Sequence, residues 1–362
     1  METMGLNTVN PSFWNNKKVL ITGNTGFKGS WMNFWLTYLG AEVCGYSLPL
    51  TEKNILYKSL CLDKETHQVF GDINDYEFLS RTISSYEPEI IFHMAAQPLV
   101  RESYKNPLHT INTNVLGTAN LLESLKESES TRVIVVITSD KCYENFEKDD
   151  PYKEDEPMGG YDPYSASKGC AEIITSSYRR SFFFCDSSAS VSSVRAGNVI
   201  GGGDWSSDRL IPDSIKSFIS KKPVSIRFPN AIRPWQDVLD PISGYLKLAE
   251  KQWENKQKFS DSWNFGPDFK SEQPVSFIMD LICKYWGNKS EWIFENNNDP
   301  HEAGILKLDS SKSRNQLNWT PQKDIETTIK DLVLWYKSYG TENNMIDLST
   351  KYIQKYMPKN GN

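Results

Sequence analysis

Short β-branched runs alternate with longer helical patterns from about residue 18 to residue 196 of the chain. Each run is bounded by turn residues or by a helix-period segment, such as 26–40 and 106–128. The expected strands are 17–22, 41–47, 89–95, 132–139 and 190–196. Runs that are apolar throughout suit strands that helices cover on both faces. The alternation therefore predicts an α/β fold with a doubly wound parallel sheet.

The regular alternation ends near Gly201, where Gly, Pro, Trp and Arg become frequent. We expect a smaller, less regular lobe there, packed over the carboxyl edge of the sheet. The predicted division is a first domain over 1–198, to which parts of the later chain can return, and a second lobe over 199–345. The predicted C-terminal tail over 346–362 can include a short helix.

Composition excludes several classes of protein. A content of 38% hydrophobic and 24% charged residues is typical of a globular chain, and a net charge of −6 argues against a general nucleic-acid binder. The N-terminus lacks an apolar segment, and no stretch reaches the ~18 apolar residues that a membrane helix needs. We therefore expect a cytoplasmic protein that binds neither nucleic acid nor a membrane.

Cysteine and histidine spacing gives no sign of a metal site. The six cysteines form no CxxC pair, so reduced intracellular thiols are the expectation. The four histidines, including His301, also lack metal-ligand spacing. No metal is predicted.

Three glycines follow the first expected strand and open the first expected helix. Gly23 permits a tight turn, Gly26 lets a pyrophosphate approach the backbone, and Gly29 allows close helix packing. Phosphates bound there meet the positive end of the helix dipole. The position at the first strand-to-helix junction favours a dinucleotide site over an ordinary tight turn.

The adenosine end of this site gives weaker signals. The second expected strand ends in GYSLPL without the carboxylate that usually holds the ribose of NAD, and Ser47 is a weak substitute. The same region also lacks the arginine cluster that would indicate NADP. Asp72, beside Ile73, is a candidate acceptor for the adenine amine, and the alternative is an acid that water solvates.

Acid–base chemistry is indicated by Tyr164 and Lys168, which lie four residues apart on one face of an expected helix. A tyrosine acts as a base near neutral pH only if a cation stabilises its phenolate, and Lys168 can supply that charge. Ser139 ends the expected strand 132–139, and Asp140 and Lys141 follow it directly. Taken alone, Asp140 and Lys141 could simply be solvent-exposed charges where a strand ends in a loop. Taken alone, the YxxxK pattern could simply be a solvent-exposed helix face.

Together, TGNTGFKG, HMAAQ, Ser139 and YSASK resemble the extended short-chain dehydrogenase/reductase family, in its nucleotide-sugar branch. The resemblance spans nearly the whole chain. Further segments are most similar to the CDP-linked 4,6-dehydratases of that branch, namely AAQPLVRESY, NTNVLGTANLLE, TSDKCYEN, RAGNVIGGGDWSSDRLIPD, IRPWQ and SGYLKLAE. The resemblance implies a Rossmann-type sheet with a smaller C-terminal substrate-binding lobe.

The same resemblance implies bound NAD that is reduced and reoxidised within each turnover. The cofactor-binding residues that it implies are Gly23, Thr25, Gly26, Phe27, Lys28, Gly29, Asp72, Ile73, Ala95, Ala96, Gln97, Tyr164 and Lys168. The implied substrate is a nucleotide hexose, with Asn198, Arg209 and Arg233 at its pyrophosphate, since arginine can bind phosphate oxygens in a bidentate manner. Each could instead make a structural contact, and Arg195 is expected to brace the site.

Catalytic roles follow from the resemblance as well. Tyr164 would take the proton of the sugar 4-hydroxyl, and Ser139 would hydrogen-bond the same oxygen. Asp140 would be the acid toward the 6-hydroxyl. Lys141, at a position that is glutamate in thymidine-diphosphate-linked relatives, would be the base at C5. A lysine serves only with a lowered pKa, and the adjacent Asp140 could raise it, so the division of labour within this pair stays open.

Two alternatives accompany this reading. Another nucleotide-sugar 4,6-dehydratase or an epimerase, linked to dTDP, GDP or UDP, would share the fold, but epimerases of the family need no acid–base pair after the hydroxyl. A non-catalytic NAD-binding regulatory protein would not need the complete set of Ser139, Tyr164 and Lys168. The family also implies a homodimer or a dimer of dimers, formed through helices such as 106–128 and 164–184. The product would feed deoxysugar synthesis for surface polysaccharide.

Overall fold

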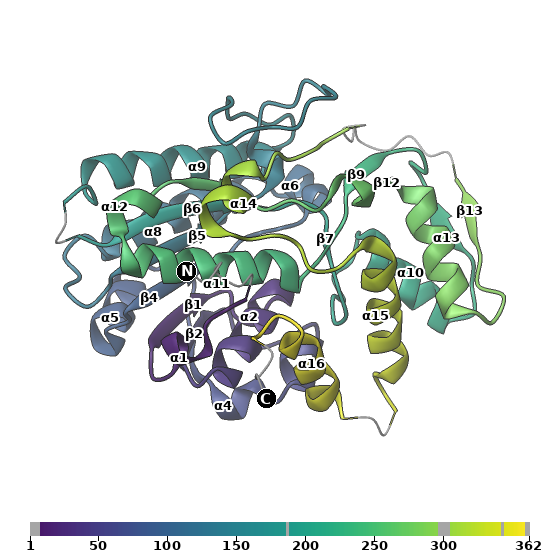
Figure 1. The fold of residues 1–362 in the computed structure, drawn as a ribbon, viewed down its shortest axis with the longest axis horizontal. Coiled ribbons are helices and arrows are strands. Elements are labelled where there is room, and N and C mark those ends of the chain that lie inside the picture. The colour runs from purple at the N-terminus through teal and green to yellow at the C-terminus, as the bar shows by residue number, and fades with distance from the viewer. Residues whose placement is uncertain (1–7, 186–187, 296–304, 342–343, 359–362) are drawn as a thin grey trace, which may run out of the picture.

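The computed structural model describes residues 8–185, 188–295, 305–341 and 344–358. Its centre is a seven-stranded sheet in the order β11-β6-β5-β4-β1-β2-β3, in which every pair is parallel (Figure 1). The strands are β1 (Lys18–Thr22), β2 (Glu42–Ser47), β3 (His67–Phe70), β4 (Ile90–His93), β5 (Val133–Ile137), β6 (Ser190–Arg195) and β11 (Ser262–Asn264). The predicted α/β class and the doubly wound parallel sheet are confirmed.

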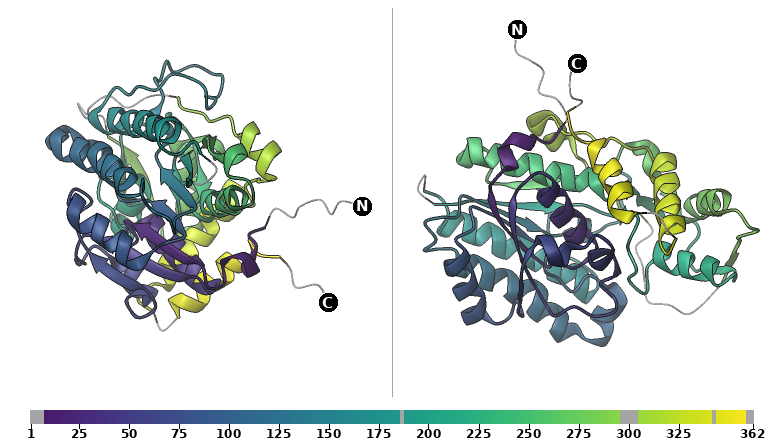
Figure 2. Two further views of the ribbon diagram at one scale, coloured as in Figure 1. Left: turned by 90° about the vertical axis from the view of Figure 1, so that its left-hand side faces the viewer. Right: turned by 90° about the horizontal axis from the view of Figure 1, so that it is seen from below.

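Alternation along the strands creates two hydrophobic cores, one on each face of the sheet. Val19 and Ile21 of β1 point into one core, whereas Leu20 between them points into the other. The first core is covered by α2 (Phe27–Tyr38) and α11 (Leu239–Glu254), and the second by α5 (Tyr76–Tyr86), α8 (Gly117–Ser124) and α9 (Pro163–Ser181). Figure 2 shows the sheet enclosed between these two layers of helices.

The sequence missed the two edge strands of the sheet. β3 is only four residues long and half-exposed, and β11 has three residues and lies far along the chain from its neighbour β6.

Further helices of the first half are α1 (Pro11–Trp14), α3 (Ile55–Ser59), α4 (Leu62–Glu65) and α6 (Val100–Lys105).

The helix predicted over 106–128 is wrong in its continuity and its end. It consists of α7 (Pro107–Ile111), a π-helical turn η1 (Asn112–Leu116) and α8, which ends at Ser124. Turns of the π type in a helix are frequent at functional sites, because they redirect a side chain. The helix expected over 164–184 is α9, which ends at Ser181.

The second lobe lies beside the carboxyl ends of the strands (Figure 1). Its strands are short, and its elements are β7 (Val199–Ile200), α10 (Leu210–Ile219), β8 (Val224–Ile226), β9 (Ile232–Pro234), β10 (Gln236–Asp237), β12 (Glu272–Pro274), α13 (Val275–Trp286), β13 (Trp292–Phe294) and α15 (Ile325–Ser338). Three two-stranded sheets, β10-β7, β12-β9 and β13-β8, join them.

The later chain crosses between the lobes. α11, α12 (Lys256–Phe259), β11 and α14 (Ser311–Leu317) lie on the main sheet, and η3 (Phe269–Ser271) leads back to β12. The tail contains α16 (Met345–Gln354), whereas residues 359–362 of the predicted tail lie outside the described residues. The domain division over 1–198, 199–345 and 346–362 stays a prediction.

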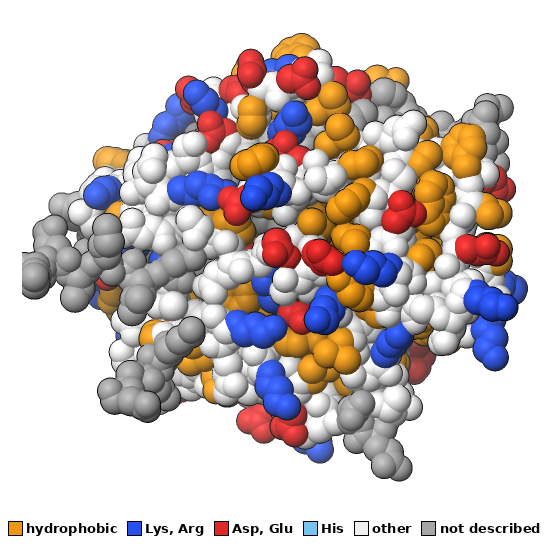
Figure 3. Space-filling view, turned by 45° about the vertical axis from the view of Figure 1, so that its right-hand side comes forward, with side chains coloured by type: hydrophobic (Ala, Val, Ile, Leu, Met, Phe, Trp, Pro, Cys, Tyr) orange, Lys and Arg blue, Asp and Glu red, His pale blue; other side chains and the backbone are white. Residues whose placement is uncertain are grey.

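Among the described residues, no helix is long and apolar enough to cross a membrane. No group of three or more His, Cys, Asp or Glu in this part of the chain is placed to hold a metal. His301 lies outside the described residues. All six cysteines are free. On the face in Figure 3, acidic and basic side chains are interspersed.

Candidate active site

The glycine loop after β1 approaches its surroundings too closely to carry side chains. Gly23 has φ +72°, and a Cβ on it would lie 2.7 Å from the backbone nitrogen of Ala95. A Cβ on Gly29 would lie 2.1 Å from the carbonyl oxygen of Gly23. Gly26, at the N-terminus of α2, is exposed, so a ligand can reach the helix end. This cradle fits the pyrophosphate of a dinucleotide.

The two residues between these glycines extend toward the rest of the site. The ring of Phe27 would lie 3.4 Å from a Cβ on Gly201, so it packs where the second lobe begins. Lys28 is partly buried, and its Nζ lies 5.9 Å from the ring centre of Tyr245 on α11. Thr25 accepts a hydrogen bond on its carbonyl from Nδ2 of Asn54 at 3.0 Å.

The carboxyl ends of β2 and β3 form the side where the adenosine is expected. Ser47 accepts a hydrogen bond from Nε2 of Gln68 at 3.2 Å and donates one to the carbonyl of Leu48 at 3.1 Å. Oδ1 of Asp72 accepts from both the backbone and the side-chain nitrogen of Asn74. The carbonyl of Ile73 accepts from Nδ2 of Asn120 on α8 at 3.1 Å. These contacts anchor both loops.

A histidine beneath the β1–β4 junction stabilises the next loop. His93 Nδ1 lies 2.7 Å from Oγ1 of Thr22, and its Nε2 lies 3.1 Å from Oγ1 of Thr118. The same Thr22 oxygen accepts from the backbone nitrogens of Met94 and Ala95. Burial, together with the charge of Lys168, lowers the pKa of His93 to about 3, so the ring is neutral. It is therefore a structural group.

Asn114, in the π-helical turn η1, was missed by sequence reasoning. Its Oδ1 accepts from the backbone nitrogen of Gln97 at 2.8 Å, and its Nδ2 donates to the carbonyl of Gln97 at 3.0 Å and to Oγ of Ser167 at 2.8 Å. It thus joins the loop that carries Ala96 and Gln97 to the YxxxK helix. The surrounding sequence, NPLHTINTNVLGTAN, contains several other Asn and Thr residues, so nothing in it singles out Asn114.

Ser139, Tyr164 and Lys168 are brought together, as the sequence predicted. Pro163 begins α9 and Asp162 caps it, accepting from the backbone nitrogen of Ser165 at 3.0 Å. This start places Tyr164 and Lys168 one turn apart, and both are buried. Nζ of Lys168 donates to the carbonyl of Ile137, at the end of β5, at 3.3 Å.

Burial controls the charge of these two groups in the ligand-free protein. It raises the pKa of Tyr164 to about 12, against a hydrogen bond with Ser139 and the charge of Arg209. It lowers the pKa of Lys168 to about 8, against the negative charge of Glu172. Lys168 is therefore an ammonium group that loses its proton more readily than usual, and it lies one helical turn from the Tyr164 phenol, which needs a nearby cation in order to ionise.

Asp140 lies at the centre of the site with an unsatisfied oxygen. The residue is 2% exposed, and its Oδ1 accepts from Oγ of Ser139 at 3.0 Å. Its Oδ2 has no hydrogen-bond partner. Burial raises the pKa of Asp140, although the charges of Lys141, Arg233 and Lys28 oppose this. An unpaired buried carboxyl oxygen is costly and is suited to a ligand group.

Lys28 is a second lysine of the site whose pKa is lowered toward neutrality. Burial lowers its pKa to about 7, helped by the cations Lys168 and Arg209 and opposed by Asp140. Tyr245, fully buried beside it, has a hydroxyl without a hydrogen-bond partner. Sequence reasoning assigned Lys28 to the cofactor alone and did not place it near Asp140.

Two of the three residues expected at the pyrophosphate act on the charged groups of the site. Arg209 and Arg233 act on the charges of Tyr164, Lys28 and Asp140, so both lie near the centre of the site. Arg209 also pairs with Asp204 at 3.0 Å. Asn198 follows β6 with φ +39°. Arg195, which was expected to brace the site, is buried in an ion pair with Glu172 at 2.8 Å.

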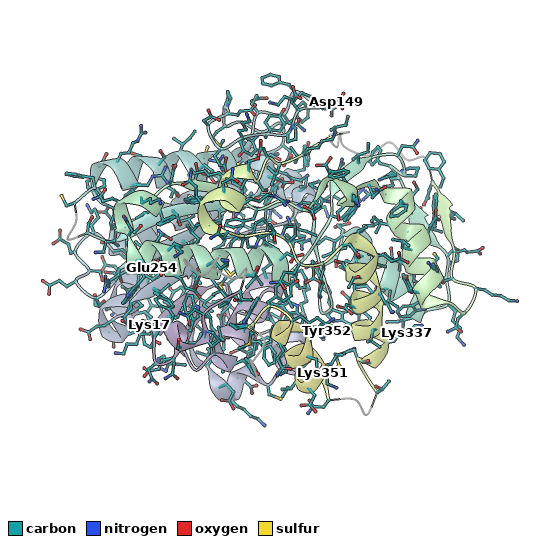
Figure 4. All side chains as sticks on the ribbon, viewed as in Figure 1. Lys17, Asp149, Glu254, Lys337, Lys351 and Tyr352 are labelled. Carbon is teal, nitrogen blue, oxygen red and sulfur yellow. The ribbon has the colours of Figure 1, made fainter. Side chains whose placement is uncertain are left out.

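The loop between Ser139 and Tyr164 is held by a small satellite core. Cys142, Tyr143 and Tyr152 pack there with Leu306 and Leu308. Its outer end carries Asp149, which is labelled in Figure 4 and lies 3.8 Å from Nζ of Lys307. The two halves of the acid–base set are thereby connected through a packed loop rather than a free one.

Comparisons with known proteins find relatives among nucleotide-sugar enzymes. CDP-glucose 4,6-dehydratase of Salmonella typhimurium is 47% identical over 353 residues, which cover 96% of this chain and 98% of that protein. UDP-glucuronate 4-epimerase 1 of Arabidopsis thaliana is 26% identical and covers 91% of this chain and 79% of its own length.

Solved structures share the fold. A dTDP-glucose 4,6-dehydratase from Bacillus anthracis, solved in complex with NAD, has a TM-score of 0.75 at 22% identity and covers 90% of this chain and 97% of its own. An epimerase from Methanothermobacter thermautotrophicus has a TM-score of 0.77 at 21% identity and covers 96% of this chain and 97% of its own.

The profile of the family described as GDP-mannose 4,6 dehydratase matches residues 20–332, which include the glycine loop, Ser139 and the YxxxK helix. The expected membership in the nucleotide-sugar branch of the extended short-chain dehydrogenases/reductases is thereby confirmed. This chain belongs to the GDP-mannose 4,6 dehydratase family.

Proposed function

We propose that the protein converts CDP-D-glucose to CDP-4-dehydro-6-deoxy-D-glucose and water, as an NAD-dependent hydro-lyase. The observation that carries the proposal is the buried Asp140, with one oxygen unpaired, directly after Ser139 and close enough to Tyr164 for its charge to act on the phenol. The likeness to the Salmonella CDP-glucose 4,6-dehydratase, over almost the full length of both chains, supports CDP as the nucleotide. Bound NAD supplies the hydride acceptor for C4 and the hydride donor for C6.

The first proton transfer is assigned to Tyr164. Its phenol accepts the proton of the sugar 4-hydroxyl once Lys168 stabilises the phenolate, while Ser139 hydrogen-bonds the same oxygen. Because burial raises the pKa of Tyr164 in the ligand-free protein, the cation beside it is essential for this step. Arg209 contributes in the same direction.

Loss of water is assigned to the residues that follow Ser139. A ketone at C4 makes the C5 proton acidic, so the site needs a base at C5 and an acid at the 6-hydroxyl. Asp140 suits the acid, since burial raises its pKa and thereby favours the protonated form. Lys141 is assigned as the base at C5. The positive charge of Lys28 favours the ionised form of that carboxyl.

The other site residues are proposed to bind the cofactor and the substrate. The glycine loop with Thr25, Phe27 and Lys28 holds the pyrophosphate side of NAD, and Asp72 and Ile73 meet the adenine. Ala95, Ala96 and Gln97 line the path between them. Asn198, Arg209 and Arg233 bind the pyrophosphate of the nucleotide sugar.

The assembly is proposed as a homodimer or a dimer of dimers. Apolar side chains on the outer surface of α7, η1 and α9 support this, because Leu108, Leu116 and Ile173 are 73%, 52% and 57% exposed. A cytoplasmic location is proposed as well, and the six free cysteines support it. The product is proposed to enter deoxysugar synthesis for surface polysaccharide.

One experiment tests the activity and its nucleotide together. Purified protein with NAD is incubated separately with CDP-, dTDP-, UDP- and GDP-linked glucose or mannose, and the alkaline absorbance of a 4-keto-6-deoxy product is followed. We expect a strong signal with CDP-glucose alone. A preference for another nucleotide would revise the substrate, and the absence of turnover with all of them would refute the dehydratase assignment.

A further inference from the structure

A buried carboxylate, Glu172, lies behind the acid–base pair. It is 4% exposed and accepts three hydrogen bonds: Oε1 from Oγ1 of Thr138 at 2.5 Å, and Oε2 from Oγ of Ser193 at 2.6 Å and from Nη2 of Arg195 at 2.8 Å. Hydrogen bonding on this scale keeps a carboxylate ionised in spite of burial. Burial disfavours the charge, but Arg195 and the two hydroxyls prevail, and the pKa of Glu172 is lowered.

These contacts join the elements that carry the catalytic groups. Thr138 directly precedes Ser139, whereas Glu172 follows Lys168 by one turn of α9. Arg195, at the end of β6, also donates to the hydroxyl of Tyr143 at 2.6 Å. Glu172 therefore connects the end of β5, the end of β6 and the YxxxK helix through one side chain.

The charge of Glu172 also acts on Lys168. The groups that face this ammonium from other elements are Lys28 of α2, His93 of β4 and Cys142 of η2 (Asp140–Cys142). His93 is neutral, and burial raises the pKa of Cys142 well above its usual value, so that thiol is neutral too. Since Lys28 is another cation or a neutral amine, Glu172 is the titratable group among these whose charge favours the ammonium form of Lys168.

We infer that Glu172 is a positioning residue of the acid–base site, which aligns Lys168 with the end of β5 and keeps it in the ammonium form. The inference rests on the proposed function, because the ammonium matters only if Tyr164 acts through a phenolate. A simple brace would need the same hydrogen bonds but would leave the protonation of Lys168 unaffected. The two roles therefore differ in a measurable quantity.

The first test measures Lys168 directly in the ligand-free protein. Lysines labelled with 13C at Cε are titrated by NMR, and the Lys168 signal is assigned with Lys168→Arg. In Glu172→Gln the pKa of Lys168 should fall by about 1 or more, the usual effect of losing an opposite charge nearby. Ser193→Ala, which removes a hydrogen bond but keeps the carboxylate, should leave it unchanged.

Glu172→Gln leaves Arg195 buried without its partner and could prevent folding. The double variant Glu172→Gln/Arg195→Met removes both charges, and Glu172→Asp keeps the negative one. We expect a lowered pKa of Lys168 in the double variant and little change in Glu172→Asp. A folded Glu172→Gln or double variant with the wild-type Lys168 pKa would overturn the inference.

The second test uses turnover of CDP-glucose. The alkaline limb of the kcat/KM profile should move to lower pH in Glu172→Gln, by the amount that the titration gives, because Lys168 loses its proton earlier. An unmoved alkaline limb would contradict the inference. Failure of the proposed function is distinguishable, since the NMR titration requires no substrate.

Discussion

Gly197 lies so close to Asp140 that a Cβ on Gly197 would be 1.7 Å from Oδ2 of the carboxyl group. The carboxyl is thereby pressed against the backbone that follows β6, and any side chain at position 197 must displace it. Asp140 is fully enclosed, so it cannot move aside without breaking its 3.0 Å hydrogen bond with Ser139. The backbone of one strand end thus determines where the proposed acid of the neighbouring strand lies.

Gly197→Ala should therefore impair dehydration with little change in cofactor binding. A misplacement on the order of 1 Å costs about 10²-fold in rate, so product formation from CDP-glucose should fall by about that factor. Affinity for NAD, followed by fluorescence titration, should stay within about twofold of the wild-type value. The φ of Gly197 lies outside the left-handed region, so the added carbon acts through its contact with Asp140 and not through backbone strain. Wild-type turnover by Gly197→Ala would contradict the proposed role of Asp140.

Lys141→Ala tests the assigned base at C5. The variant should lose exchange of the C5 proton with solvent, by about 10² to 10⁴-fold, since a positioned base contributes that much. Oxidation at C4 should remain detectable, because Tyr164, Ser139 and Lys168 are unchanged. The measurement follows deuterium uptake at C5 from heavy water by mass spectrometry. Unchanged exchange would refute the role of Lys141.

Lys28→Met tests the influence of the Lys28 charge on Asp140. The positive charge of Lys28 opposes the rise in the pKa of Asp140, so its removal favours the protonated form of Asp140 that the elimination needs. The pH at which dehydration slows through loss of the Asp140 proton should therefore be higher in Lys28→Met than in the wild type. Lys28→Arg, which keeps a positive charge, is the matched control and should not raise this pH. A pH profile of Lys28→Met that matches the wild type would exclude this influence.

The sequence predicted the relative placement of Ser139, Tyr164 and Lys168 better than the packing behind them. The order of glycines and the YxxxK spacing reflect local geometry, so Ser139, Tyr164 and Lys168 could be placed from the sequence. Asn114 could not, because its value depends on a π-helical turn that no periodicity indicates. Glu172 could not be predicted from the sequence either, since its partners Thr138 and Arg195 are distant from it along the chain.

Edge strands show the same limit for the fold. β11 consists of Ser262–Asn264 and becomes a strand only because β6 presents an unpaired edge to it. Three residues are too few to predict a strand from the sequence, and pairing with β6 determines their extended conformation. The lobe that begins after β6 was predicted as irregular for the same reason: its strands have two or three residues each.

Glu250 gives a prediction about stability rather than catalysis. It lies on α11, four residues before the labelled Glu254 of Figure 4, and its Oε1 accepts from Nε1 of Trp14 at 2.8 Å and from the backbone nitrogen of Asn10 at 2.9 Å. Burial raises the pKa of Glu250 to about 7. A raised pKa of an acid means that its contribution to stability is present below the unfolded pKa and is lost as the pH rises through the folded one.

Glu250→Gln should consequently stabilise the protein at alkaline pH. The amide keeps an oxygen for Trp14 and Asn10 but carries no charge, so it avoids the cost of ionising a buried acid. We expect the free energy of unfolding to rise by about 1–2 kcal/mol at about pH 8 and to match the wild type near pH 4. Denaturant unfolding at both pH values measures this difference, and Glu254→Gln, an exposed acid on the same helix, should leave it unchanged. An equal gain at both pH values would show that the effect comes from packing and not from the charge.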